Sequence, residues 1–377
     1  MEPLVVEGAR EISARAEREL EALVAVSSPS GDLAGAEEAV ALCAALLPAE
    51  AKTERVPCST PGGAADLVAR IAGRGSRRVL LLGHLDTVVA HDAHVPLRHE
   101  ADRLYGTGVV DMKGGVVLAL GAARALAAAA TDRFGELVLL LVTDEEWRTA
   151  EFGHVARFSG FDVCLCFEAG ERGPGGAEGV VVRRKAAGTL RVQAAGRAAH
   201  SGSAPDQGAN ALLALARAAT ALAAHHDPAG PDRLSVVPTV MRAGGALNVV
   251  PAAGELVFDM RADQLSAFGP VVAAVPAERD GVALSATMER QWPGMDSAAA
   301  TAPLLARAGA MLGRPIVPVR RGGASDASHF ASQIPLTVDG LGPRGGGAHT
   351  PEEFVLTASL RARAEVALAI AYAALQN

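Results

Sequence analysis

Short apolar runs alternate with helical patterns in the first half of the chain. Apolar residues recur every three to four positions over residues 8–25 and again over residues 32–47, which predicts two helices. Three runs of buried-strand length follow, at residues 79–82, 137–142 and 163–167. A helical pattern lies between the first two runs, over residues 114–130. The sequence therefore predicts a βαβ unit in a largely parallel sheet.

The pattern changes after Glu168. Residues 170–179 are rich in glycine, and we interpret them as a linker. Beyond it we expect strands at 180–184, 189–192, 234–241 and 254–261, and helices at 205–224 and 265–274. From about residue 295 the chain again shows helical patterns at 302–312 and 358–375 and strand patterns at 316–319 and 334–338.

These elements predict an α/β fold, with a mostly parallel sheet covered by helices and a smaller α+β domain inserted into it. We expect residues 1–177 and 290–377 to form the larger domain and residues 178–289 to form the inserted one. A chain of 377 residues is long enough for two such domains.

Composition and charge narrow the class of protein. Half of the residues are hydrophobic and 20% are charged, which excludes an intrinsically disordered chain. The net charge of −7 leaves no basic surplus, so we expect neither nucleic acid nor a membrane surface as a partner. No apolar run approaches the roughly 20 residues that span a bilayer. With no secretory signal pattern and no spaced cysteine framework, the sequence predicts a cytoplasmic protein.

Acidic or histidine residues follow each of the three apolar runs. His84 and Asp86 follow the first, Glu145 and Glu146 the second, and Glu168 the third. Because the carboxyl ends of parallel strands face one crevice, we expect these side chains to converge.

Two further candidates lie near glycine-rich segments. Asp111 precedes the predicted helix at 114–130, and His349 follows the glycine-dense segment 340–347. Two histidines with several carboxylates suit zinc, and they are numerous enough to hold two ions about 3.5 to 4 Å apart with one ligand bridging. Any one of these acids could instead cap a loop or pair with an arginine, but together they favour a hydrolytic di-metal site.

These motifs resemble those of a known family. Residues 83–88, 106–115, 143–146, 167–168 and 348–349 are similar, in that order, to the metal motifs of the di-zinc exopeptidases and deacylases. That family includes bacterial glutamate carboxypeptidase, acetylornithine deacetylase, succinyl-diaminopimelate desuccinylase and the aminoacylases. The resemblance covers nearly the whole chain and is nearest in motif to glutamate carboxypeptidase. It implies a zinc-exopeptidase-like catalytic domain with an inserted lid and dimerisation domain.

The resemblance also implies a role for each candidate residue. His84 and Glu168 would bind one zinc ion, Glu146 and His349 would bind the other, Asp111 would bridge both, Glu145 would be the general base, and Asp86 would orient His84. Cobalt or manganese could replace zinc.

The predicted inserted domain resembles the family's lid. Residues 199–211 and 248–251 match the lid motifs that contain His200 and Asn248, which in relatives polarise the scissile carbonyl, often in the active site of the dimer partner. Arg261 would grip the substrate carboxylate, and Arg290 is a second candidate for that contact. The resemblance therefore implies a homodimer formed through the lid.

The chain departs from the family pattern after Glu146, where relatives usually carry a short run rich in glycine and serine. Here residues 147–154 include bulky side chains, which we expect to reshape one wall of the pocket.

We expect a zinc-dependent hydrolase that cleaves an amide bond beside a free carboxylate in a small peptide or an N-acyl amino acid. The alternatives are an N-acyl-amino-acid deacylase and, from another class, a catalytically silent binding protein on the same fold. A silent protein is expected to have lost a ligand or the base, and none is missing.

Overall fold

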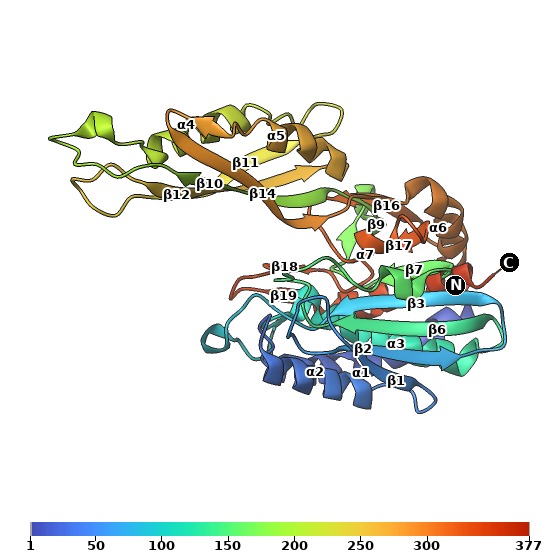
Figure 1. Ribbon diagram of the computed structural model, residues 1–377. Coiled ribbons are helices and arrows are strands. Elements are labelled where there is room, and N and C mark those ends of the chain that lie inside the picture. Colours follow the sequence, from blue (N-terminus) through green and yellow to red (C-terminus); the bar gives the residue numbers. More distant parts are fainter. Residues whose placement is uncertain (1, 377) are drawn as a thin grey trace. The chain divides into compact units, whose positions relative to one another are not determined.

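The computed structural model describes residues 2–376, which divide into two compact units (Figure 1). Unit 1 runs from the N-terminal helix to Arg183 and also contains Met295–Arg321 and the chain from Ser325 onward. Unit 2 consists of Arg184–Gly294 and the short segment Gly322–Ala324. Each unit has a hydrophobic core of its own.

A six-stranded sheet forms the centre of unit 1, in the order β1-β2-β6-β3-β7-β17. Its strands are β1 (Lys52–Val56), β2 (Asp66–Ala72), β3 (Arg77–His84), β6 (Phe134–Val142), β7 (Val163–Cys166) and β17 (Leu336–Val338). Strand β3 is parallel to β6 and β7, and β17 is parallel to β7, which confirms the predicted, largely parallel sheet. The antiparallel strands β1 and β2 were not predicted, in part because four of the five residues of β1 are exposed and polar.

Helices pack on the sheet of unit 1, with α1, α2 and α3 on the same face in Figure 1. The helices are α1 (Pro3–Ala25), α2 (Leu33–Ala45), α3 (Gly114–Ala129), α6 (Ala298–Leu312), α7 (Ala327–Phe330) and α8 (Thr357–Ala374). Along β3, Val79 and Leu81 join the core that contains α1, α2, α3, α6 and α8, whereas Leu80 and Leu82 join a second core on the other face, which contains α7. Both faces of the strand are buried, which is why its sequence shows no alternation.

One helical stretch among the described residues, Val109–Ala129, is long and apolar enough to cross a membrane, with a mean hydropathy of 1.4 over its most apolar window. We expected no such stretch from the sequence. However, 78% of that window is buried inside the protein, where α3 packs against α1, α8 and β3. A buried core helix passes the same test of length and composition, so this stretch is only weak evidence for a membrane span.

Two smaller sheets complete unit 1. One contains β8 (Glu171–Arg172), β9 (Glu178–Arg184), β15 (Met295–Asp296) and β16 (Ile316–Arg321), and the other contains β4 (Arg98–Glu100), β5 (Arg103–Tyr105), β18 (Gly345–Gly346) and β19 (Phe354–Leu356). The prediction of a linker at 170–179 is wrong, because β8 and β9 form a hairpin there. Gly175 and Gly176 have φ values of 66° and 79°, which glycine adopts readily and which close this tight turn.

Unit 2 is built on a five-stranded sheet in the order β11-β12-β10-β14-β13. Its strands are β10 (Ala186–Ala195), β11 (Ser235–Ala243), β12 (Ala253–Ala262), β13 (Glu278–Arg279) and β14 (Val282–Trp292), and its helices are α4 (Ala211–Ala223) and α5 (Gly269–Ala273). Helix α4 is shorter than the predicted helix at 205–224, because Asn210 caps its start by accepting a hydrogen bond from the Leu213 amide. Strand β14 was missed, since small Ala and Ser residues weaken its alternation.

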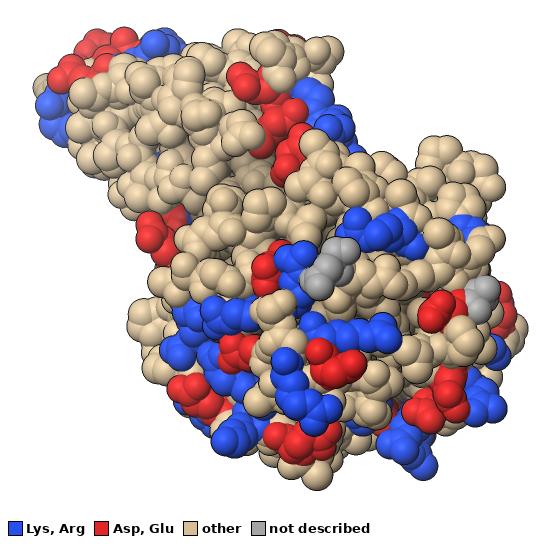
Figure 2. All heavy atoms as spheres, turned by 90° about the vertical axis from the view of Figure 1, so that its right-hand side faces the viewer, with Lys and Arg blue, Asp and Glu red and all other residues tan. Residues whose placement is uncertain are grey.

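Charged side chains of both signs are interspersed on the face shown in Figure 2, so this face carries no broad field of one sign.

Candidate active site

Three neighbouring strands of the central sheet end at one edge, and five candidate residues lie there. His84 is the last residue of β3, Glu145 and Glu146 follow β6 after two further residues, and Glu168 follows β7. Asp86 lies just beyond His84. Since β3 is parallel to both β6 and β7, the three carboxyl ends lie side by side, as the sequence pattern predicts.

A first cluster joins His84, Asp111 and Glu168. The Nε2 atom of His84 lies 3.1 Å from Oδ1 of Asp111 and 3.8 Å from Oε1 of Glu168. His84 is only 2% exposed, and Asp111 sits in the turn Val109–Lys113 that leads into α3. One potential ligand atom from each residue lies within 4.8 Å of the others, close enough to hold a metal ion.

A second cluster joins Asp111, Glu146 and His349. The Nε2 atom of His349 lies 3.1 Å from Oδ2 of Asp111 and 3.0 Å from Oε1 of Glu146. His349 lies in the loop between β18 and β19. Asp111 therefore belongs to both clusters and presents one carboxylate oxygen to each histidine.

The electrostatics of these clusters suit a cation. Burial raises the pKa of Glu146, and the charge of Asp111 adds to the shift while His349 opposes it. Burial alone would lower the pKa of His84, but hydrogen bonds to Asp111 and Asp86 raise it well above its usual value. Buried carboxylates this close together need positive charge nearby. Two imidazoles and three carboxylates form a nitrogen and oxygen donor set that fits zinc, so the residues match a metal site.

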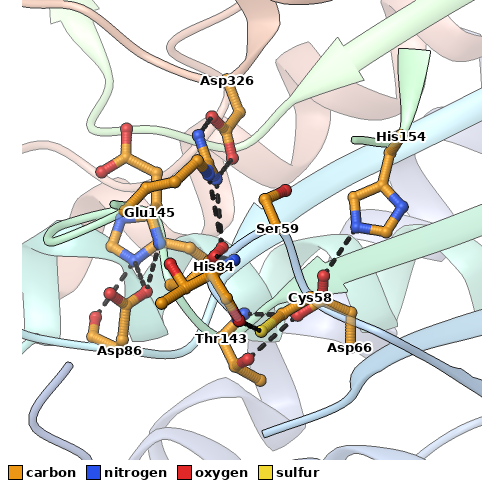
Figure 3. Close-up of polar contacts among 12 residues, drawn as sticks. Cys58, Ser59, Asp66, His84, Asp86, Thr143, Glu145, His154 and Asp326 are labelled. Atoms are coloured by element: carbon orange, nitrogen blue, oxygen red, sulfur yellow. Dashed lines mark hydrogen bonds and ion pairs between the residues drawn. The ribbon is translucent and has the colours of Figure 1, made fainter. Parts of the chain in front are cut away.

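Asp86 connects the histidine to the loop after β6 (Figure 3). Its carboxylate oxygens accept hydrogen bonds from the backbone N–H groups of Glu145 and Glu146, each at 3.0 Å, and the hydroxyl of Ser30 donates to it as well. The Nδ1 atom of His84 lies 3.0 Å from the backbone carbonyl of Asp86 and 3.4 Å from its carboxylate. Asp86 thereby fixes the orientation of the imidazole and the path of the loop together.

Glu145, unlike its neighbour Glu146, joins neither cluster. Burial raises its pKa well above the usual value, with the charge of His84 opposing the shift and those of Asp326 and Glu168 adding to it. Glu145 thus lies beside two candidate metal clusters without being a candidate ligand. A carboxylate in such a position can accept and donate protons.

A buried polar layer supports the loop that carries Glu145. Oδ1 of Asp66 accepts hydrogen bonds from the Thr143 amide at 2.8 Å and its hydroxyl at 3.0 Å, and Oδ2 lies 2.7 Å from Nε2 of His154 (Figure 3). Arg148 donates to both carboxylate oxygens of Asp326 at 2.5 and 2.7 Å. These contacts join β2 and the start of α7 to the loop after β6.

The sequence gives no signal for these supporting residues. Arg148 and Asp326 are 178 positions apart, and Asp66 and His154 are 88 positions apart. None belongs to a short motif with chemistry of its own, so only the fold reveals their pairing.

In unit 2, the segments that carry His200 and Asn248 are paired. The amide of Ser201 donates to the Asn248 carbonyl at 3.0 Å, and His200 forms an antiparallel bridge with Val249. His200 and Asn248 are both exposed. The Nδ1 atom of His200 accepts hydrogen bonds from the amides of Gly202 at 3.1 Å and Ser203 at 3.2 Å. This leaves Nε2 as the nitrogen that carries the proton and can donate.

The two candidate arginines lie on strands that flank β10. Arg261 pairs with Ala187 in the sheet, and Arg290 pairs with Thr189. The guanidinium of Arg261 already contacts the carboxylate of Asp259 at 2.9 to 3.2 Å, so it would have to exchange this partner to bind a substrate. The guanidinium of Arg290 lies 4.8 Å from the ring centroid of Trp292.

A cavity of about 280 Å³ lies beside the loop after β6. Its lining includes Ser30, Asp32, Thr60, Ala64, Asp144 and Trp147. Trp147 is 62% exposed and lines this cavity together with Thr149, whereas none of the candidate metal ligands lines it.

Comparisons with known proteins agree with this fold. Residues 80–373 match peptidase family M20/M25/M40. Carboxypeptidase G2 of Pseudomonas sp. strain RS-16 is 27% identical over 356 residues, which cover 88% of this chain and 82% of that protein. A succinyl-diaminopimelate desuccinylase of Xylella fastidiosa strain 9a5c is 32% identical over 208 residues, 50% of this chain and 54% of the relative, so the match spans about half of that enzyme.

The crystal structure of a tripeptidase from Staphylococcus aureus Mu50 shares the fold, with a TM-score of 0.77 over 97% of this chain and 99% of that one, at 19% identity. The predicted resemblance is confirmed, and the family match spans the carboxyl-end edge of the sheet and both candidate clusters. With most of its length matched, the chain belongs to peptidase family M20/M25/M40 and is a metallo-hydrolase.

Proposed function

We propose that the protein is a zinc-dependent hydrolase that cleaves an amide bond next to a free carboxylate, with a specificity like that of a glutamate carboxypeptidase. One observation carries the proposal: Asp111 belongs to both candidate metal clusters, whereas Glu145 belongs to neither. The similarity to carboxypeptidase G2 along most of both chains supports this choice of substrate.

Two zinc ions suit the donor set, with cobalt or manganese as substitutes. His84 and Glu168 would hold one ion, Glu146 and His349 would hold the other, and Asp111 would bridge them. When bound, the ions supply Lewis-acid polarisation of the scissile carbonyl and lower the pKa of water.

Glu145 moves the proton in this proposal. Its carboxylate accepts a proton from the attacking water and passes it to the leaving nitrogen. The C–N bond breaks as the new C–O bond is completed, so the products are an amine and a carboxylic acid. Asp86 holds the backbone of this loop at the Glu145 and Glu146 amides and so keeps the base in place.

The side chains of unit 2 would bind the substrate. Since its Nδ1 accepts two backbone hydrogen bonds, His200 would donate from Nε2 to the oxygen of the scissile carbonyl, with Asn248 beside it. Arg261 would bind the substrate carboxylate after leaving Asp259, and Arg290 is the second candidate for this contact. In this proposal unit 1 is the catalytic domain and unit 2 is the lid.

We also assign unit 2 to dimerisation with a second copy of the chain. Strand β11 is at the edge of its sheet, and Val237 and Met241 on this strand are each 42% exposed. Leu213 on α4 is 50% exposed. An unpaired strand edge beside apolar side chains is suited to pair with another copy.

All four cysteines are unpaired, which supports a reducing, cytoplasmic location.

The second candidate function is N-acyl-amino-acid deacylation, which the match to the desuccinylase favours. Both reactions break an amide bond next to a carboxylate with the same base and ligands. In both, the released nitrogen belongs to an amino acid with a free carboxylate, and the two reactions differ in the acyl group on the other side of the bond.

A hydrolysis screen tests the proposal. Zinc-loaded protein is offered peptides with C-terminal glutamate, the same peptides amidated at the C-terminus, N-acetyl and N-succinyl amino acids, and dipeptides. We expect fastest cleavage of the free C-terminal glutamate peptides and none of the amidated ones. Faster cleavage of the N-acyl amino acids would favour the deacylase, and absence of turnover in metal-loaded protein would indicate a silent binding protein.

A further inference from the structure

Glu353 is a buried carboxylate close to the site that has no part in the chemistry proposed above. It is 2% exposed and lies just before β19, on the same loop as His349. Burying a carboxylate is costly unless hydrogen bonds satisfy its oxygens. Its contacts therefore indicate what it does.

Both oxygens of Glu353 bind the backbone that carries Asp111. Oε2 accepts a hydrogen bond from the amide of Gly108 at 2.9 Å. Oε1 accepts from the amides of Val110 at 2.8 Å and Asp111 at 3.0 Å. The backbone carbonyl of Glu353 accepts a fourth hydrogen bond, from the amide of Gly106 at 3.1 Å.

The turn held in this way has an irregular backbone. Gly108 has a φ of 75°, and Asp111 has φ and ψ values of −129° and 89°, outside the helical region. A regular helix or strand would pair such amides within itself, but this turn leaves three of them to one side chain. Glu353 holds the amide of Asp111, and the carboxylate of the same residue contacts both His84 and His349.

We propose that Glu353 is a positioning residue that sets the geometry of both metal clusters. It fixes the backbone of Asp111, the residue common to the two clusters, and ties this backbone to the loop that carries His349. The inference rests on the proposed metal site, in which Asp111 bridges two ions. Groups that orient metal ligands typically contribute 10- to 100-fold to metal affinity.

Two substitutions at this position and one beside it separate positioning from general stability. Glu353→Ala removes all three side-chain acceptor contacts. Glu353→Gln has nearly the same shape, and its carbonyl oxygen can still accept from Val110 and Asp111, but its NH₂ group cannot accept from Gly108. Glu352→Gln is the matched control, because Glu352 is the exposed neighbour and contacts neither cluster.

The test measures metal binding by full-length protein without substrate. Chelator-stripped variants are titrated with Zn²⁺ against a chromophoric chelator, the visible spectrum of bound Co²⁺ reports coordination geometry, and thermal melting of the metal-free protein reports stability. We expect Glu353→Ala to lose about 10- to 100-fold in affinity for at least one ion and to alter the Co²⁺ spectrum. Glu353→Gln should lose less, and Glu352→Gln should match the wild type.

Wild-type affinities and an unchanged Co²⁺ spectrum in both Glu353 variants would overturn the proposal, even if their metal-free forms melted earlier. If Glu353→Ala does not fold, Glu353→Gln decides by the same two readouts. A wild type that binds only one ion would contradict the two-ion part of the proposed function. The role of Glu353 would then be judged on that ion, since Asp111 belongs to both clusters.

Discussion

Among single residues, the role proposed for each carboxylate of the site depends on which groups its two oxygens already contact. Asp111 uses one oxygen towards each histidine, and Asp86 uses its oxygens on two amides and a serine hydroxyl. Glu145 and Glu146 are adjacent in sequence, yet only Glu146 belongs to a cluster. Chemically identical neighbours thus have different surroundings, and the proposed function assigns them different roles.

This difference between neighbours gives a first prediction. Glu145→Gln should abolish turnover and leave the metal content nearly intact, because the amide cannot accept the proton and the ligands remain. Glu146→Gln should lower both activity and metal content. Steady-state kinetics and elemental analysis of the two variants check this. A Glu145→Gln enzyme with a rate near wild type would show that the base lies elsewhere.

The role proposed for His200 predicts a loss of turnover when its imidazole is removed. If its Nε2 donates to the developing oxyanion, His200→Ala should cost roughly 10² to 10³ in kcat, the usual effect of losing one such donor. Metal content should stay the same. His99→Ala, at an exposed histidine of β4, is the control and should keep wild-type kinetics. An unchanged kcat in the His200 variant would remove this residue from the mechanism.

At the scale of elements, the loop after β6 is held by contacts from distant parts of the chain. Strong apolar runs made the strand ends visible in the sequence, and with them His84, Glu145 and Glu168. The supporting ion pair of Arg148 and Asp326 was not predictable, because it joins residues far apart in sequence. Glu353 was equally hidden, since nothing in the sequence distinguishes it from its exposed neighbour Glu352.

Arg148 gives a prediction at this scale. Arg148→Met leaves Asp326 buried without its cation, which should lower the free energy of unfolding by about 3 to 5 kcal/mol. Arg157→Met, which breaks a more exposed pair with Glu54, should cost at most about 1 kcal/mol. Urea unfolding of both variants measures the difference. Equal effects of the two substitutions would contradict a special role for the buried pair.

At the scale of the whole molecule, the proposed base and the proposed lid histidine belong to different units, Glu145 to unit 1 and His200 to unit 2. If the lid acts across a dimer, mixing inactive His200→Ala and Glu145→Gln chains should restore part of the activity. Some mixed sites would then combine an intact base with an intact lid. Activity is measured on purified heterodimers, with each homodimer as control. Heterodimers without any activity would indicate that each site is completed within one chain.

In the proposed function, two metal ions held by one shared aspartate drive amide hydrolysis. Elemental analysis of the purified protein, combined with activity during chelation and stepwise return of Zn²⁺, tests this proposal. We predict about two ions per chain, loss of activity on chelation, and its recovery as the second equivalent of zinc is restored. At most one tightly bound ion, with full activity retained in chelator, would contradict the account.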